Sequence, residues 1–156
     1  MMKKLFATLI TLGLLLAACG TSEAEQDDAV RDDTGEILEG AETGVLALQE
    51  GDCWNDSSAT QISSVETVAC TEPHDNQLVG FVDLPDGDWT GQAQTGEDSQ
   101  AACDETFGYL FDNEQNLDLS LFPVYPTEQS WDAGDREVQC SLYASDLAKL
   151  TEDRLG

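Results

Sequence analysis

The sequence predicts a small α+β domain in which an antiparallel β-sheet carries one main packed helix and two disulfides. Three observations predict this fold class. Short segments rich in β-branched and aromatic residues alternate with turns rich in Gly, Pro and Asp, which is typical of an antiparallel sheet. One segment has apolar residues at helical spacing, and four of the five cysteines remain for disulfides once the first is assigned to an export signal. The 156 residues leave room for one domain.

An export signal occupies the N-terminus. Lys3 and Lys4 supply positive charge, and residues 5–16 form an uncharged, mostly apolar stretch with the length of a signal-peptide core rather than of a membrane span. The stretch ends in Leu-Ala-Ala-Cys, the pattern of a lipobox, in which the cysteine thiol takes a diacylglycerol. We therefore expect residues 1–18 to be removed as a lipoprotein signal peptide and Cys19 to be lipidated. The alternative is an ordinary secretory signal cut at the same place, with Cys19 as a plain thiol.

Lipid attachment sets the expected location. Two or three acyl chains, palmitate among them, would anchor the mature protein firmly, so we expect it on the extracytoplasmic face of the cell membrane. Residues 19–43 are rich in Glu, Asp, Thr, Gly and Ala and predict a disordered acidic tether that begins at the lipidated cysteine. A folded domain is expected over residues 44–145, followed by a C-terminal tail over 146–156.

The mature chain is strongly acidic. The sequence has 32 Asp and Glu against 6 Lys and Arg, a formal net charge of −26, and loss of Lys3 and Lys4 makes it −28. Such a charge excludes nucleic acid as a partner and repels anionic lipid head groups, so the acyl chains must hold the protein at the membrane without help from charge. We interpret the acidity as solubility or salt adaptation, with a site for cations or for a basic partner as the alternative.

The elements of the domain follow in order from local patterns. A brief apolar run opens the domain, β-rich runs lie on either side of a Pro-His break, and a stretch dense in Asp, Gly, Pro and Gln predicts a loop. Later, two prolines confine a further β-rich run to the edge of the sheet. The expected elements are a first strand and turn over 45–54, strands over 65–69 and 77–83, a long exposed loop over 83–96, a helix over 98–110, an edge strand over 119–125, a strand over 136–143 and a short terminal helix from Ser145.

Two of these elements have the clearest patterns. Residues 101–110 contain apolar side chains at helical spacing, and Asp98 or Ser99 is the candidate cap of this helix. Residues 136–143 alternate strictly, with apolar side chains on one face and Glu, Gln and Ser on the other. The helix and this last strand are therefore expected to share the core.

Four cysteines remain in the domain after Cys19 is assigned to lipid: Cys53, Cys70, Cys103 and Cys140. An even number in an exported chain predicts two disulfides. Four cysteines allow three connectivities, and the sequence alone does not choose among them. We favour Cys53 with Cys70, because they lie on successive strands, and Cys103 with Cys140, because this bridge would pin the helix to the last strand.

The sequence contains no catalytic or cofactor-binding constellation, so we expect no enzyme activity and no cofactor. His74 is the only histidine, which excludes clustered imidazole metal sites and leaves one candidate general base without an accompanying nucleophile motif. Its expected role is structural, through hydrogen bonds in the turn that Pro73 opens.

Two acidic segments are candidates for binding a cation. Residues 112–123 resemble a calcium loop, but they lack the glycine needed at the sixth position and the glutamate needed at the twelfth. Asp83, Asp86 and Asp88 would hold a cation only loosely. We interpret these aspartates as part of a solvated loop and expect no metal site.

Trp54, Trp89 and Trp131 are candidates for a platform that stacks on sugar rings. We interpret Trp54 and Trp131 as core residues, because they adjoin predicted elements, and leave Trp89, in its polar loop, open between the two roles. Arg136 is the only basic residue of the expected domain. It is expected to form a structural ion pair rather than an anion site, because carboxylates are abundant around it.

Several motifs together resemble a known family. They are Gly51, Asp52, Cys53 and Trp54, then Cys70, Pro73 and His74, then Ala102 and Cys103, then Pro126, Thr127, Trp131, Gly134, Asp135, Arg136, Val138 and Cys140. In this order and spacing, the chain resembles the septum formation domain of actinobacterial envelope proteins over roughly residues 45–143. One departure is Gln77, where an acidic residue is expected after the Pro-His turn. The resemblance implies a link to cell division and implies no enzymatic activity.

Two functional hypotheses follow. The leading one is a membrane-anchored, non-catalytic interaction module of the cell envelope, whose partner is an unidentified envelope or division protein. The alternative is an extracytoplasmic lipoprotein that binds or senses a ligand, such as a cation, a peptide or a wall sugar, through the acidic loop and Trp89.

Overall fold

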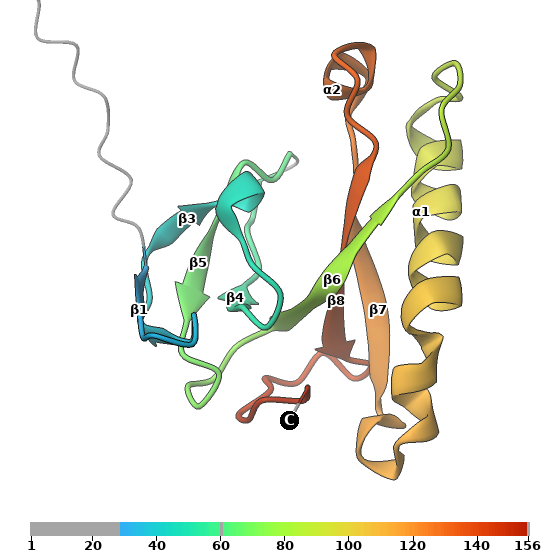
Figure 1. The fold of residues 1–156 in the computed structure, drawn as a ribbon. Coiled ribbons are helices and arrows are strands. Elements are labelled where there is room, and N and C mark those ends of the chain that lie inside the picture. Colours follow the sequence, from blue (N-terminus) through green and yellow to red (C-terminus); the bar gives the residue numbers. More distant parts are fainter. Residues whose placement is uncertain (1–28, 60, 156) are drawn as a thin grey trace, which may run out of the picture.

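The computed structural model describes residues 29–59 and 61–155, so the segment expected to be a signal peptide, and Cys19, lie outside the described residues (Figure 1). The strands are β1 (Val30–Arg31), β2 (Ile37–Glu39), β3 (Glu42–Gly44), β4 (Cys53–Asn55), β5 (Ser64–Val68), β6 (Asn76–Asp83), β7 (Leu119–Val124) and β8 (Glu137–Ala144). The α-helices are α1 (Gln92–Phe107) and α2 (Glu128–Asp132), and the 3₁₀ turns are η1 (Val45–Ala47), η2 (Gly108–Asp112) and η3 (Glu114–Asn116).

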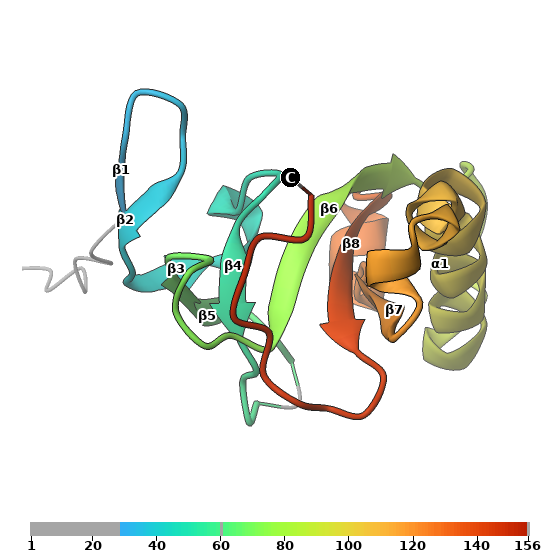
Figure 2. The ribbon, with the colours of Figure 1, turned by 90° about the horizontal axis from the view of Figure 1, so that it is seen from below.

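The main sheet has six antiparallel strands in the order β3-β5-β4-β6-β8-β7. The eight-residue strands β6 and β8 are the longest and pair with each other. Helix α1 packs along β7 and the adjoining parts of β6 and β8 at one end of the molecule, and β1 and β2 form a separate hairpin at the other end (Figure 2). This architecture confirms the α+β prediction.

The four strands predicted from β-rich patterns are present. The segments expected over 65–69, 77–83, 119–125 and 136–143 correspond to β5, β6, β7 and β8, and each boundary lies within one residue of its expected position. In β8 the alternating apolar side chains are buried in the core, as the pattern indicates, and Gln139 and Ser141 on the other face are buried as well. The prolines keep β7 at the edge, where a missing backbone donor is tolerated.

The sheet carries two hydrophobic clusters, one in each half of the domain. The larger lies between α1 and strands β6, β7 and β8 and includes Leu121, Val138 and Leu142. The smaller lies around β4 and β5 and includes Trp54 and Val65.

Each half contains one disulfide, and both favoured pairings are confirmed. Cys53 and Cys70, with Cα atoms 5.2 Å apart, join β4 to the segment after β5. Cys103 and Cys140, with Cα atoms 5.7 Å apart, join α1 to β8. The second bridge therefore pins the main helix to the sheet.

The expectation of a disordered tether through residue 43 is wrong for residues 30–43. Strands β1 and β2 pair with each other, and β3 forms the edge of the main sheet beside β5. Arg31 holds the hairpin in place, because its guanidinium contacts both carboxylate oxygens of the buried Asp52, with Nη2 2.7 Å from Oδ2. Gly40 approaches the sheet so closely that an added Cβ would lie 1.8 Å from the carbonyl oxygen of Thr67. Contacts that are remote in sequence thus order this segment.

The main helix begins earlier than predicted. It starts at Gln92, six residues before Asp98, so the loop expected over 83–96 is shorter. The helix buries Thr95 and Ser99, whose hydroxyls donate to carbonyl oxygens four residues earlier at 3.1 and 2.7 Å. Because these buried side chains are polar, apolar spacing does not mark the first turns.

Two shorter elements also differ from the prediction. Residues 45–47 form a single 3₁₀ turn rather than a strand. The residues described after β8, up to 155, form no helix. They run as a C-terminal strap across the β4 and β6 side of the molecule, and Leu150 exchanges two backbone hydrogen bonds with His74, at 2.8 and 3.0 Å (Figure 2).

In the part of the chain that the structure describes, no helix combines the length and apolar character needed to cross a membrane.

Candidate functional site

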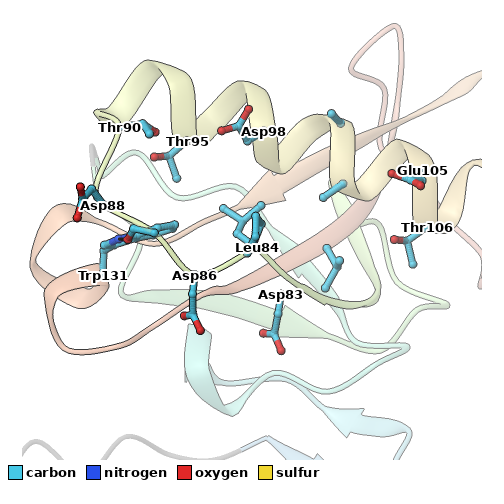
Figure 3. A pocket seen from close by; sticks show the side chains of 15 residues that line it. Asp83, Leu84, Asp86, Asp88, Thr90, Thr95, Asp98, Glu105, Thr106 and Trp131 are labelled. Carbon is cyan, nitrogen blue, oxygen red and sulfur yellow. Dashed lines mark hydrogen bonds between the residues drawn. The ribbon is translucent and has the colours of Figure 1, made fainter.

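A groove with a volume of about 690 Å³ lies between α1 and residues 82–90, the segment that leads from the end of β6 toward the helix (Figure 3). We call it the α1 groove. Apolar and small side chains form its interior, and carboxylates stand at its rims. The residues that line it are Val82, Asp83, Leu84, Pro85, Asp86, Gly87, Asp88, Thr90, Thr95, Asp98, Ala101, Ala102, Glu105, Thr106 and Trp131.

One face of α1 forms one wall of the groove. Thr95, Asp98, Ala102 and Glu105 are three or four residues apart, so they lie on the same side of the helix. The alanine is small and leaves space beside the helix, whereas a longer side chain there would fill it. The neighbouring Cys103 is bonded to β8, so the disulfide fixes this wall.

Trp131 closes one end of the groove. Helix α2 begins with a capping box, in which Thr127 and Ser130 each accept a hydrogen bond from the other's backbone N–H at 3.2 and 3.0 Å. The cap directs Trp131 into the larger hydrophobic cluster. The indole Nε1 donates to the carbonyl oxygen of Gly87 at 3.0 Å, and the ring meets Trp89 edge-on with centroids 5.6 Å apart. These contacts between α2 and residues 82–90 hold this end of the groove.

Arg136 fixes the orientation of the same indole. Its guanidinium lies 3.7 Å from the centroid of the Trp131 ring, and Nη1 donates to the carbonyl oxygens of Trp131 at 2.9 Å and Asp135 at 2.6 Å. The expected ion pair is present, with Nε 3.5 Å from the carboxylate of Asp86. That aspartate side chain is 99% exposed, so water screens the pair and its contribution to stability is small. Arg136 thus acts mainly through its stack on the indole.

The three tryptophans do not form an open stacking platform. Trp54 is 1% exposed, and its indole N–H donates to the hydroxyl of Ser141 at 3.4 Å. Trp131 is 9% exposed and has Arg136 over its ring. Trp89 is partly buried and packs against the same cluster as Trp131. Trp54 and Trp131 are core residues, as interpreted from the sequence, and Trp89 joins them.

Five exposed carboxylates stand at the rims of the groove. Asp98 and Glu105 belong to α1, and Asp83, Asp86 and Asp88 belong to the opposite segment (Figure 3). No lysine or arginine is among the lining residues. Within residues 29–59 and 61–155, no group of three or more His, Cys, Asp or Glu side chains is arranged to hold a metal ion. The three loop aspartates are part of this acidic rim.

His74 lies in a separate, fully buried site at the Pro-His turn. Its Nδ1 is 2.8 Å from the carbonyl oxygen of Glu72, to which the ring donates, as the predicted role in the turn requires. Burial lowers the pKa of His74, because a charged ring would lose its water, and the hydrogen bond to Glu72 opposes this shift. Among the described residues no nucleophile hydrogen-bonds to the ring, and Nε2 has no hydrogen-bond partner. This arrangement is structural.

Gln77 is a buried polar residue whose role the sequence analysis missed. Its Nε2 donates to Oδ1 of Asp153 at 2.6 Å, and its Oε1 accepts from the backbone N–H of Arg154 at 2.8 Å, so it fixes the C-terminal strap. An amide suits this position, because a carboxylate would face that of Asp153. The partners are 76 and 77 residues away, so no local pattern signals the contact. Asp52, which receives Arg31, was missed for the same reason.

The fold and the groove define a small disulfide-bonded α+β domain with an acidic-rimmed groove. The family model described as Septum formation matches residues 14–146, which is most of the chain. This chain therefore belongs to the Septum formation family, which confirms the resemblance noted in the sequence. No curated protein and no solved structure matches it. Membership relates the chain to septum formation, and the family is not a known enzyme family.

Proposed function

We propose that this protein is a non-catalytic interaction module of the cell envelope that acts in septum formation. Lipid on Cys19 would hold it on the extracytoplasmic face of the membrane. The family match is the observation that carries the septal part of the proposal.

The two disulfides support a domain that folds outside the cytoplasm. Cys53, Cys103 and Cys140 have no exposed surface, and Cys70 is 8% exposed. Disulfides form and persist in oxidising compartments and are rare in the cytosol. Bridges buried this deeply serve the fold rather than a redox reaction, and they fit the export signal.

The distribution of polar groups favours binding over catalysis. The one histidine is buried and points into a turn. The α1 groove has an apolar interior between acidic rims, which is a composition typical of recognition sites. The groove is therefore the surface of the described domain best suited to an interaction.

Imaging tests the septal part. The full chain, fused at its C-terminus to a fluorescent protein that matures outside the cytoplasm and expressed at its native level, should concentrate at the septum of dividing cells. The control is the same reporter exported with residues 1–28 alone. A signal spread evenly over the envelope for both proteins would contradict a septal role.

Labelling with radioactive palmitate tests the anchor. The wild-type chain should incorporate the label, and its intact mass should show loss of residues 1–18 and a diacylated Cys19. Cys19→Ala should incorporate no label and keep the signal peptide, because the lipoprotein signal is read through that cysteine. An unlabelled wild-type chain cut at the same place would indicate an ordinary secretory signal instead.

A further inference from the structure

We propose that the α1 groove binds an extended segment of a partner protein in which basic residues alternate with apolar ones. This inference rests on the proposed interaction function and names the chemistry of the partner.

The shape of the groove fits a short extended chain. Along α1 its wall runs from Thr95 to Thr106, eleven residue steps, which is about 16 Å at the helical rise of about 1.5 Å per residue. An extended chain of about five residues spans the same length at about 3.3 Å per residue. The volume of about 690 Å³ accommodates a few side chains. The occupant is thus a short linear segment.

The interior of the groove selects apolar side chains on one face of that segment. Leu84, from the segment opposite the helix, and Trp131 supply large apolar side chains to the lining (Figure 3). Ala101 and Ala102 supply only small side chains from α1. In an extended segment alternate side chains point to opposite faces. Every second residue can therefore enter the groove while its neighbours reach the rims.

The rims select the charge of the neighbouring residues. Asp98 and Glu105 flank the groove on α1, and Asp83, Asp86 and Asp88 flank it on the other side. No basic side chain lines the groove. Arg136, whose guanidinium is stacked on Trp131, lies outside the lining and pairs with one rim carboxylate, that of Asp86, at 3.5 Å. Lysine or arginine on the segment would complement both rims, whereas acidic peptides and anionic lipid would be repelled.

The groove is held in shape before any partner arrives. The Cys103–Cys140 disulfide fixes the helix wall, and the hydrogen bond from Trp131 to Gly87 ties α2 to the opposite segment. A site that is already ordered loses little conformational entropy on binding. The charge of the whole protein attracts any basic chain, and the groove adds an ordered apolar interior to that attraction.

Fluorescence anisotropy with a labelled Lys-Leu-Lys-Leu-Lys peptide tests the inference on the full chain. The peptide should bind, and Asp98→Asn with Glu105→Gln should weaken binding about tenfold. The matched control, Glu39→Gln with Glu50→Gln, removes the same charge at exposed positions outside the groove and should change binding less than about twofold. Ala101→Trp, at an exposed position, should abolish binding by filling the groove, with the unfolding midpoint measured to verify its fold.

Three outcomes would overturn the inference: equal weakening in both double variants, equal affinity for a Lys-Gly-Lys-Gly-Lys peptide, and no binding at all. The first two would show that the peptide binds only through general charge attraction.

Imaging separates failure of the groove inference from failure of the proposed function. If the wild-type fusion reaches the septum and the Asp98→Asn, Glu105→Gln fusion reaches it equally well, the groove inference fails while the septal role stands. If the wild-type fusion is not septal, the proposed function fails whatever the peptide does.

Discussion

The buried imidazole of His74 links the stability of the domain to pH. Burial lowers its pKa below the usual 6.5, although the hydrogen bond to Glu72 opposes the shift. Between 6.5 and the lower pKa of the folded state, the unfolded chain binds more protons than the folded one. The contribution of His74 to the free energy of unfolding is therefore fully present above pH 6.5 and is lost as pH falls through the folded pKa.

Urea unfolding at a series of pH values, from about 8 down to about 5, measures this contribution against His74→Gln. The difference in unfolding free energy between wild type and variant should shrink as the pH falls. The charged groups near the ring are Lys149, Asp75 and Asp153. Burial raises the pKa of Asp75, but hydrogen bonds from Lys149 and from the backbone of Asp56 together outweigh it and leave that pKa lowered, so the contribution of Asp75 is lost only at more acidic pH. A difference that stays constant across the series would contradict this account.

The close approach of Phe107 leaves no room for a side chain at Gly80. This glycine lies in the irregular part of the β6–β8 pairing with a φ of +151°, and a Cβ there would lie 2.7 Å from Cζ of Phe107. Gly80→Ala should lower the free energy of unfolding by about 1 to 3 kcal/mol through overpacking between β6 and α1. In a double-mutant cycle measured by urea unfolding, Phe107→Leu should recover part of that loss. Strictly additive effects would show that the ring is not the obstacle.

At the scale of elements, one buried ion pair holds the N-terminal hairpin. Asp52 is 3% exposed, and besides Arg31 its carboxylate accepts the backbone N–H of Gln49 at 2.8 Å. Arg31→Gln should lower the free energy of unfolding by about 2 to 3 kcal/mol, because it leaves a buried carboxylate without its cation. Arg31→Lys should recover only part of this, because an ammonium cannot contact both oxygens as the guanidinium does.

Hydrogen exchange, read together with urea unfolding, locates this effect. In Arg31→Gln the amides of β1 and β2 should lose protection before those of β6 and β8. The control is Glu39→Gln, an exposed change on the same hairpin, which should leave exchange unaltered. Equal loss of protection across both ends of the sheet would argue that the pair supports the whole fold rather than the hairpin.

At the scale of the whole molecule, each disulfide stabilises one half of the domain. The bridges close loops with sequence separations of 17 and 37 residues. On the chain-entropy model they contribute roughly 3 and roughly 4 kcal/mol respectively. Replacing both cysteines of a pair by alanine should therefore lower the free energy of unfolding more for Cys103 and Cys140 than for Cys53 and Cys70. Calorimetry of the two double variants measures the order, and the reverse order would show that packing outweighs loop closure. Loss of both bridges together would remove most of the stability expected of a domain of this size.

The sequence by itself determined the elements whose signal is local. The alternation in residues 136–143 and the β-rich runs before them predicted β5 to β8 within one residue, because β-branched and aromatic residues between turn residues are a local signal of strands. The cysteines predicted two bridges, and the positions of a helix and a final strand favoured the correct pairing. The motifs also identified the family.

Only the tertiary structure decided the features that depend on distant partners. The hairpin over residues 30–39 looked like a tether because its composition is polar, and its order comes from Arg31 meeting Asp52 across 21 residues. The start of α1 was missed because its first turns bury threonine and serine rather than apolar residues. The groove needed both chain segments together, since aspartates and alanines that are far apart in sequence become one surface only when α1 packs beside residues 82–90. Local periodicity records which face of an element is buried, whereas a site depends on which elements meet, and that is fixed by packing across the whole chain.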